Sequence, residues 1–362
     1  MLLIYARVNS LYSRAVEVLL DTWNIKGHDP LSLKEAVPQL ACVAFQLMRA
    51  GKQTATEKEL LLLLEEARER VPQIRRYTKD SPHEFLKRVE LRSSLLLEAG
   101  HQIEAGRTVP FYQFRHLTFQ EYLAAVAAAE GHYIDYNKDD TVLTPLATCL
   151  TAEKWKEVVP MAAVLARKQA EPLMVALIEQ GCEIKRQMES NQAIQKEKAQ
   201  DYSIELVPPV ARLVQCLIEE AEAAPETLTQ ALQLVAYFAD GCNSEEDWQA
   251  LSRGPYGEEL LHQAWLFFSG LSWKDVNPLN TCTFIASQRW GRLSNGKDEA
   301  EIELKRLLVS DIEEEIARGL FTIAGQISTY LSYRDRPDPK IQSFSDKYLD
   351  FVEKHLFNDS LV

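Results

Sequence analysis

Residues 291–298 come nearest to a phosphate-binding sequence in this chain. Gly291, Gly296 and Lys297 have the GxxxxGK spacing of the loop whose amides and lysine hold nucleotide phosphates. Asp298 then stands where a serine or threonine would bind magnesium, and no strand-like segment precedes the loop. We therefore interpret residues 291–298 as a connector between helices. The acidic motif that would bind magnesium in such an enzyme is not recognisable in the sequence.

The sequence gives little sign of other catalytic motifs. The sequence contains neither HExxH nor GxSxG, and its histidines show no metal-ligand spacing. The acidic run at 313–315 suits a solvated helix face. The aromatic residues Trp265, Phe267, Phe268 and Trp273 suit a core, or part of a ligand-sensing surface. The sequence predicts no catalytic residue and no metal site.

The segment 112–125 is predicted to be a strand that enters a helix. Thr118 and Glu121 have the spacing of a capping box, in which a hydroxyl and a carboxylate satisfy the first helical amides. Phe119, Tyr122, Leu123 and Val126 then form an apolar stripe. His116 comes just before the predicted helix start, where amides and the helix dipole favour an anion. An imidazole there could donate a hydrogen bond to a phosphate oxygen.

The same string carries a resemblance to a known family. Phe114-x-His116-x-TFQEYLAA, which ends at Ala125, resembles the end of the winged-helix domain in NACHT proteins. These are signal-transducing ATPases that include animal inflammasome sensors and bacterial anti-phage proteins. Four collinear segments also resemble the family. Residues 10–23 resemble the last helix of its small helical domain, residues 40–47 and 56–61 resemble helices of its winged helix, and residues 85–98 resemble a helix and a strand of that domain. The likeness therefore covers about residues 1–130.

The resemblance implies a role for one residue. In the family the matching histidine touches the β-phosphate of bound ADP and helps hold the closed, inactive state, a role that we carry to His116 alone. The family's NTPase core lies N-terminal to the matched segments. The resemblance therefore implies the C-terminal portion of a NACHT protein, with ADP or ATP and magnesium expected only with an NTPase core in cis or in trans. A fragment, a truncated gene model and one subunit of a split system all remain open.

The composition is that of a globular protein, and the periodicity is helical. The chain has 362 residues, of which 46% are apolar and 26% charged. Apolar residues recur at helical spacing in sets that begin at Leu11, Leu60, Val210, Leu228, Leu304 and Phe344. Residues 94–98 and 111–116 are predicted to form a small hairpin with a long connection that contains Gly100, Gly106 and Pro110. The polar residues 185–203 are predicted to form a mobile connection or an exposed helix.

These patterns and the resemblance together predict the architecture. The expected fold is mainly α, with a winged-helix domain, a hairpin wing and a helical C-terminal region, for which a solenoid-like stacking remains open. The expected domains are a remnant of a helical domain (1–27), the winged helix (28–130), a helical domain (131–222) and a C-terminal helical domain that senses a trigger or binds a partner (223–362).

Charge and cysteine content restrict the partners. Residues 1–130 carry 17 basic and 16 acidic residues, whereas residues 131–362 carry 23 and 37. The acidic half would repel nucleic acid and anionic lipid. No run of 18 apolar residues exists, which argues against a membrane span. The six cysteines lie far apart without a CxxC pair, which suits reduced thiols and a cytoplasmic location.

Three functional hypotheses follow. The first is that the chain is the regulatory and sensing portion of a NACHT-type signalling ATPase. Its trigger is unidentified and is expected to be a protein, and activation is expected to lead to oligomerisation. Any antiviral defence role rests on the resemblance alone. The second is a nucleic-acid-binding winged helix, for which Lys87, Arg88 and Arg92 would share a basic helix face. Arg75, Arg76 and Lys79 would extend that surface. The third is a non-catalytic helical scaffold.

Overall fold

The protein is mainly helical with one small antiparallel sheet. The computed structural model describes residues 8–22, 31–104, 106–195, 207–238, 247, 250–251, 254–257, 259–260 and 263. The chain divides into two compact units, one of residues 1–183 with 211–227, the other of residues 184–210 with 228–362. The helical class and the hairpin are thereby confirmed, while the four expected domains stay a prediction.

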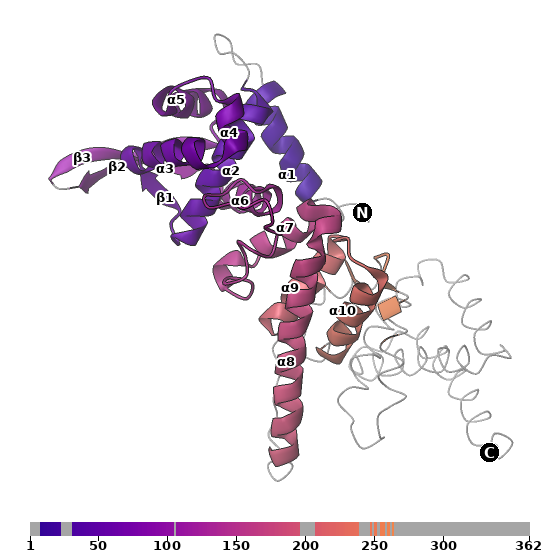
Figure 1. The fold of residues 1–362 in the computed structure, drawn as a ribbon. Coiled ribbons are helices and arrows are strands. Elements are labelled where there is room, and N and C mark those ends of the chain that lie inside the picture. The colour runs from indigo at the N-terminus through magenta and orange to yellow at the C-terminus, as the bar shows by residue number, and fades with distance from the viewer. Residues whose placement is uncertain are drawn as a thin grey trace, which may run out of the picture. The chain divides into compact units, whose positions relative to one another are not determined.

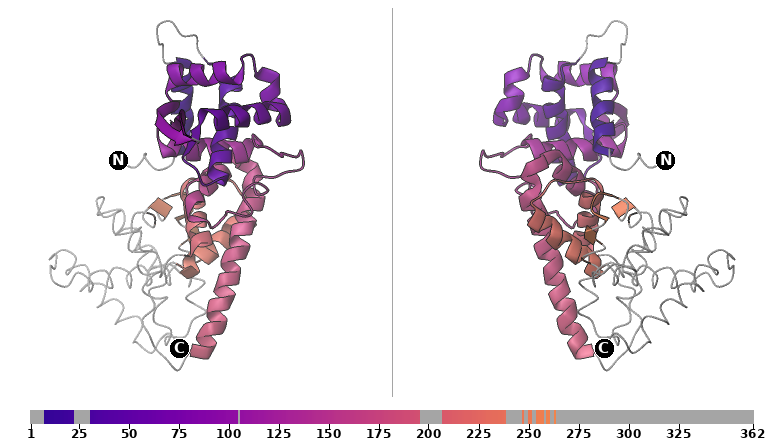
Figure 2. Two further views of the ribbon diagram at one scale, coloured as in Figure 1. Left: turned by 90° about the vertical axis from the view of Figure 1, so that its left-hand side faces the viewer. Right: turned by 90° about the vertical axis from the view of Figure 1, so that its right-hand side faces the viewer.

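Figures 1 and 2 show the elements. Helix α1 (Val8–Glu17) runs into a π-helical turn, η1 (Val18–Thr22). Next come α2 (Leu33–Arg49), β1 (Thr54–Thr56), α3 (Glu57–Arg70), α4 (Pro72–Tyr77), α5 (Pro82–Ser93), β2 (Leu96–Glu104), β3 (Arg107–Phe114) and α6 (Leu117–Glu130). Then follow η2 (Glu153–Trp155), α7 (Val158–Ala166), η3 (Arg167–Ala170), α8 (Glu171–Gln195), α9 (Pro208–Ile218) and α10 (Pro225–Phe238). The polar stretch from 185 to 195 continues α8, as an exposed helix would.

Helix α6 lies in the core of the first unit, packed against α2 and α7. Every residue from 122 to 128 is buried, so this helix has no solvent-facing stripe over two turns. Small side chains make this possible, because alanines let helix backbones approach closely. They are Ala124, Ala125, Ala127 and Ala128 on α6 and Ala36, Ala41 and Ala44 on α2. A larger side chain at one of these positions would cost about 1–3 kcal/mol of overpacking.

The sheet has the strand order β1-β3-β2, with both pairs antiparallel. The long connection expected inside the hairpin is wrong, because β2 and β3 remain paired until Glu104 faces Arg107. Gly100 sits at a bulge with φ +148, and Pro110 lies just beyond the residues that β1 pairs. A bulge accepts glycine, and a strand tolerates proline where its missing N–H is not needed. These strands project beyond the neighbouring helices (Figure 1).

Two capping boxes start α3 and α5, and neither is the one predicted. Thr56 with Glu59, and Ser81 with Glu84, each exchange the two hydrogen bonds of the motif. The box expected at Thr118 is wrong, because α6 begins at Leu117 and its N-cap residue is His116. Thr118 is therefore already inside the helix, where its hydroxyl cannot reach the amide three residues on.

The buried faces of two predicted helices are confirmed. Leu60, Leu64 and Ala67 are buried on α3, and the apolar residues of the set that begins at Val210 are all buried on or beside α9. The first helix is different: Val16 and Leu20 are buried, whereas the exposed fraction of Leu11 is 67%. Helical spacing alone could not distinguish these neighbouring faces, since both carry apolar residues.

Several predictions lie outside the described residues. They concern the loop 291–298, the aromatic group from 265 to 273, the acidic run at 313–315 and the helices that begin at Leu304 and Phe344.

The turn after α6 depends on a glycine. Gly131 has φ +72, and a Cβ there would lie 2.5 Å from the ring of Tyr136. The same loop is fixed by a 2.7 Å hydrogen bond from the Tyr133 hydroxyl to Asp140 and by an ion pair between Arg70 and Asp135. The ion pair with Arg70 ties this loop to α3.

Gly131→Ala should destabilise the protein by about 2–4 kcal/mol, since backbone strain of about 1 kcal/mol adds to the cost of displacing the Tyr136 ring. Gly106→Ala is the matched control, because Gly106 has φ +76 but nothing within 4 Å of its Cβ position. Urea unfolding of both variants measures the difference. Equal losses for the two variants would contradict the close packing of Tyr136.

Candidate functional site

His116 occupies the N-cap position of α6. Its backbone is extended, with φ −135 and ψ 143, and its carbonyl accepts the Phe119 amide at 3.1 Å. Its side chain is exposed and makes no capping hydrogen bond. The imidazole lies against the Phe119 ring, with 6.1 Å between ring centroids. The ring is thus supported on one side and available to a ligand on the other.

Contacts on both sides fix the start of α6. Before it, the Arg115 amide donates to the Leu95 carbonyl at 2.9 Å, which continues the link between β3 and the start of β2. Within its first turns, the buried Gln120 side chain donates through Nε2 to the Lys52 carbonyl at 2.9 Å. This bond joins α6 to the turn that precedes β1. No pattern in the sequence predicted this bond, although a glutamine among buried positions is a signal for one.

Helix α1 packs against the first turns of α6 through aromatic rings. Tyr12 contacts Phe119 edge-on at 6.1 Å and Tyr122 at 5.8 Å between centroids. Burial raises the pKa of Tyr122, and its hydroxyl also interacts with Ser13. Because Phe119 contacts both Tyr12 and His116, a shift of α1 would change the packing of the His116 imidazole.

The electrostatics at this helix start favour an anion. The first amides of a helix lack intrahelical acceptors and form the positive end of its dipole. No acidic residue occupies the first turn of α6, and the exposed Arg115 precedes His116. An anion of phosphate size could therefore receive hydrogen bonds from amides and from the imidazole together.

His116 differs from the other histidines that the structure describes. His83 lies 3.6 Å from Glu57, His101 lies 3.6 Å from Glu98, and His132 lies 3.0 Å from Glu130. Within the described part of the chain, His116 is the histidine without a carboxylate at ion-pair distance. A histidine that serves an external anion needs this freedom.

The predicted basic helix face on α5 is wrong. The exposed fraction of Arg92 is 3%, and its guanidinium donates to the Asp21 carbonyl at 3.0 Å. Arg88 is paired with Asp80, and Lys87 is exposed. Arg88 therefore contacts the loop before α5 and Arg92 contacts η1, so the two do not form an exposed basic face with Lys87. The exposed Arg75, Arg76 and Lys79 lie outside this face.

No cluster of three potential metal ligands occurs among the described residues, and none of the helices described combines the length and apolar character of a membrane crossing. Two open cavities of about 380 and 420 Å³ are lined by other residues than His116. No protein-family model, curated protein or solved structure matches this chain.

Gln120→Met should destabilise the protein by about 1–3 kcal/mol, because methionine keeps the length but leaves the Lys52 carbonyl without its donor. Gln102→Met, at an exposed position of β2, should change little. The free energy of unfolding in urea measures both. If Gln120→Met lost less free energy of unfolding than the control Gln102→Met, the hydrogen bond from Gln120 to the Lys52 carbonyl would not be what holds α6 in place.

Glu121 provides a pH-dependent test of the same helix. Burial, and then the nearby Glu157, raise the pKa of its carboxyl above the usual range. The folded protein then holds this proton more tightly than the unfolded chain, so its contribution to stability is present at low pH and lost as pH rises through the raised pKa. Glu121→Gln should therefore be more stable than the parent at pH 7, and the difference should shrink as pH falls through the raised pKa and be lost by about pH 4. A constant difference across pH would contradict the raised pKa.

Proposed function

We propose that this chain is the regulatory and sensing portion of a NACHT-type signalling ATPase. The observation that carries the proposal is the exposed, unpartnered His116 at the N-cap of α6. In the proposed mechanism, a nucleotide-bound NTPase core docks on this helix start, and His116 donates to the β-phosphate of ADP. The added contact favours the closed state over the open one, since a ligand shifts an equilibrium by its differential affinity for the two states.

The arrangement of the first unit supports the winged-helix part of this proposal. Helices α2, α3 and α5 precede the β2–β3 hairpin, and β1 completes a three-stranded sheet. We assign the hairpin as the wing and α1 as the end of the preceding helical domain. The nucleotide, its magnesium and the phosphate-binding loop belong to a core in cis or in trans, and nothing in the described residues supplies them.

The second part of the proposal concerns the trigger. Residues 131–362 would bind an unidentified protein and so favour an open, oligomerising ATP state. The chain alone would then be regulatory and without ATPase activity. A cytoplasmic location and a role in antiviral defence belong to this proposal: the first rests on the cysteine pattern and the second on the resemblance of residues 1–130.

His116→Ala should weaken ADP retention and favour activation. The experiment uses this chain together with the NTPase module encoded with it, in the same reading frame or an adjacent one. The ADP dissociation rate should rise about tenfold, the effect expected for losing one hydrogen bond to a charged group. His101→Ala, an exposed histidine on the wing, is the matched control and should leave the rate unchanged.

Two results would overturn the proposal. One is the absence of any NTPase module at the locus that binds this chain. The other is an ADP dissociation rate for His116→Ala equal to that of the parent and of the His101 control, which is what a plain helical scaffold predicts. Binding of duplex DNA at low salt would instead support the nucleic-acid hypothesis, for which the structure offers no exposed basic face on α5.

A further inference from the structure

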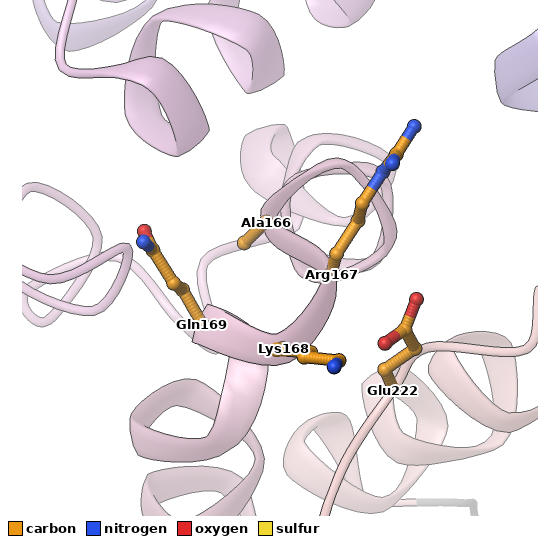
Figure 3. Close-up of a pocket in the computed structure, with 5 residues that line it drawn as sticks. All are labelled: Ala166, Arg167, Lys168, Gln169 and Glu222. Carbon is orange, nitrogen blue, oxygen red and sulfur yellow. The ribbon is translucent and has the colours of Figure 1, made fainter.

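A groove of about 420 Å³ lies where the start of α2, helix α4 and the end of α6 come together. Its apolar wall consists of three residues of α2 and one aromatic residue of α4, namely Leu33, Val37, Pro38 and Tyr77. The cavity of about 380 Å³ differs, because charged side chains of both signs line it and Ala166 is its one apolar residue (Figure 3). Of the two, the groove beside α2 is therefore the one that can hold an apolar side chain.

Two hydrogen-bonding groups of the groove lining lack a partner in the fold. Pro38 lies inside α2 and has no N–H, so the Lys34 carbonyl, four residues earlier, loses its helical donor. His132 is 6% exposed, and its Nε2 lies 3.0 Å from Oε2 of Glu130. Its buried Nδ1 has no partner among the described residues. The groove thus offers a free backbone acceptor beside an apolar wall, which suits the N–H of a bound peptide.

Basic side chains without acidic partners lie at the same place. The Nζ atom of Lys34 is 6.0 Å, and the Cζ atom of Arg76 is 5.6 Å, from the centre of the Tyr77 ring. Glu130, the acidic residue of the groove lining, is already at ion-pair distance from His132. Four exposed basic residues of α2, α4 and the loop after α4 form no ion pair with any residue that the structure describes: Lys34, Arg75, Arg76 and Lys79.

The combination of an apolar wall, a free acceptor and unpaired cations indicates the kind of partner. Carboxylates would neutralise the cations, and an apolar side chain would fill the groove. Nucleic acid fits less well, because the cations over the Tyr77 ring compete with a stacking base and the apolar wall would stay uncovered. We propose that this groove binds an acidic peptide segment of a partner protein, with an apolar side chain of that segment held between α2 and α4. This inference does not depend on an NTPase core.

The test measures peptide binding to the whole chain by fluorescence anisotropy at low ionic strength, because exposed ion pairs are screened by salt. The probes are fluorescein-labelled peptides with a central pair of apolar residues, Leu-Leu, Ile-Val, Phe-Leu or Trp-Leu, between runs of three glutamates. At least one should bind with a dissociation constant of about 10–100 μM. Serines in place of its apolar pair should weaken binding about tenfold, as expected for losing a buried side chain.

Three outcomes with these probes would overturn the proposal. The first is that none of the four peptides binds. The second is that the serine version binds as tightly as its parent peptide, which would mean that no apolar side chain enters the groove. The third is that a single-stranded or duplex DNA oligonucleotide binds more tightly than every peptide, which would assign the surface to nucleic acid.

Val37→Lys separates an apolar anchor from simple charge attraction. Val37 is half-buried in the apolar wall, so a lysine there obstructs the groove while it adds a positive charge. The proposal predicts about fivefold weaker binding of the acidic peptide, because the apolar contact is lost. A surface that attracts the peptide by charge alone would bind it more tightly, and that result would contradict the proposal.

Reversal of two charges tests the basic residues at the groove. Lys34→Glu combined with Arg76→Glu should weaken peptide binding about tenfold, since two exposed ion pairs are replaced by repulsion. Lys58→Glu combined with Lys138→Glu is the matched control, because both lysines are exposed and neither lines the groove. Urea unfolding of each variant checks that the fold is kept. Equal binding by the two double variants would contradict the proposal.

Discussion

The close packing of α6 on α2 is the constraint on which the rest of the first unit depends. Alanines on both helices bring the two backbones together, and residues 122–128 are buried as a result. A buried helix must still satisfy its ends. At the C-terminal end Gly131 supplies the left-handed residue, and at the N-terminal end Gln120 anchors the first turns to the Lys52 carbonyl. His116 is thereby held at the surface, at the end of a helix that cannot readily move.

This arrangement bears on the signalling role proposed for His116. Its ring contacts Phe119, and Phe119 contacts Tyr12 of α1. A displacement of α1 relative to α6 would change the support of the imidazole without unfolding either helix. Such a coupling between two packed elements is what a conformational switch requires, provided that a ligand binds the two arrangements with different affinity.

The sequence predicted elements better than their ends. Helices with a clear apolar stripe, such as α3 and α9, were placed correctly because burial follows periodicity. The cap of α6 was misplaced because Thr118 and Glu121 have the right spacing, yet spacing does not fix where the helix begins. Gly100 and Pro110 predicted a loop inside the hairpin. In the structure Gly100 lies at a bulge, and Pro110 lies just beyond the residues that the short strand β1 pairs, so both residues fit within the strands. The burial of Arg92 depends on its contact with Asp21, a distant residue that no local pattern reveals.

The central claim is that His116 contacts the phosphate of a nucleotide held by an NTPase core. The most direct measurement is the NMR signal of ¹³Cε1-labelled histidine in the complex of this chain with its core, assigned through its loss in His116→Gln. The account predicts that ADP shifts the His116 signal, because a phosphate that accepts a hydrogen bond from the imidazole changes the surroundings of its Cε1 atom. A His116 signal that does not respond to saturating ADP would contradict it.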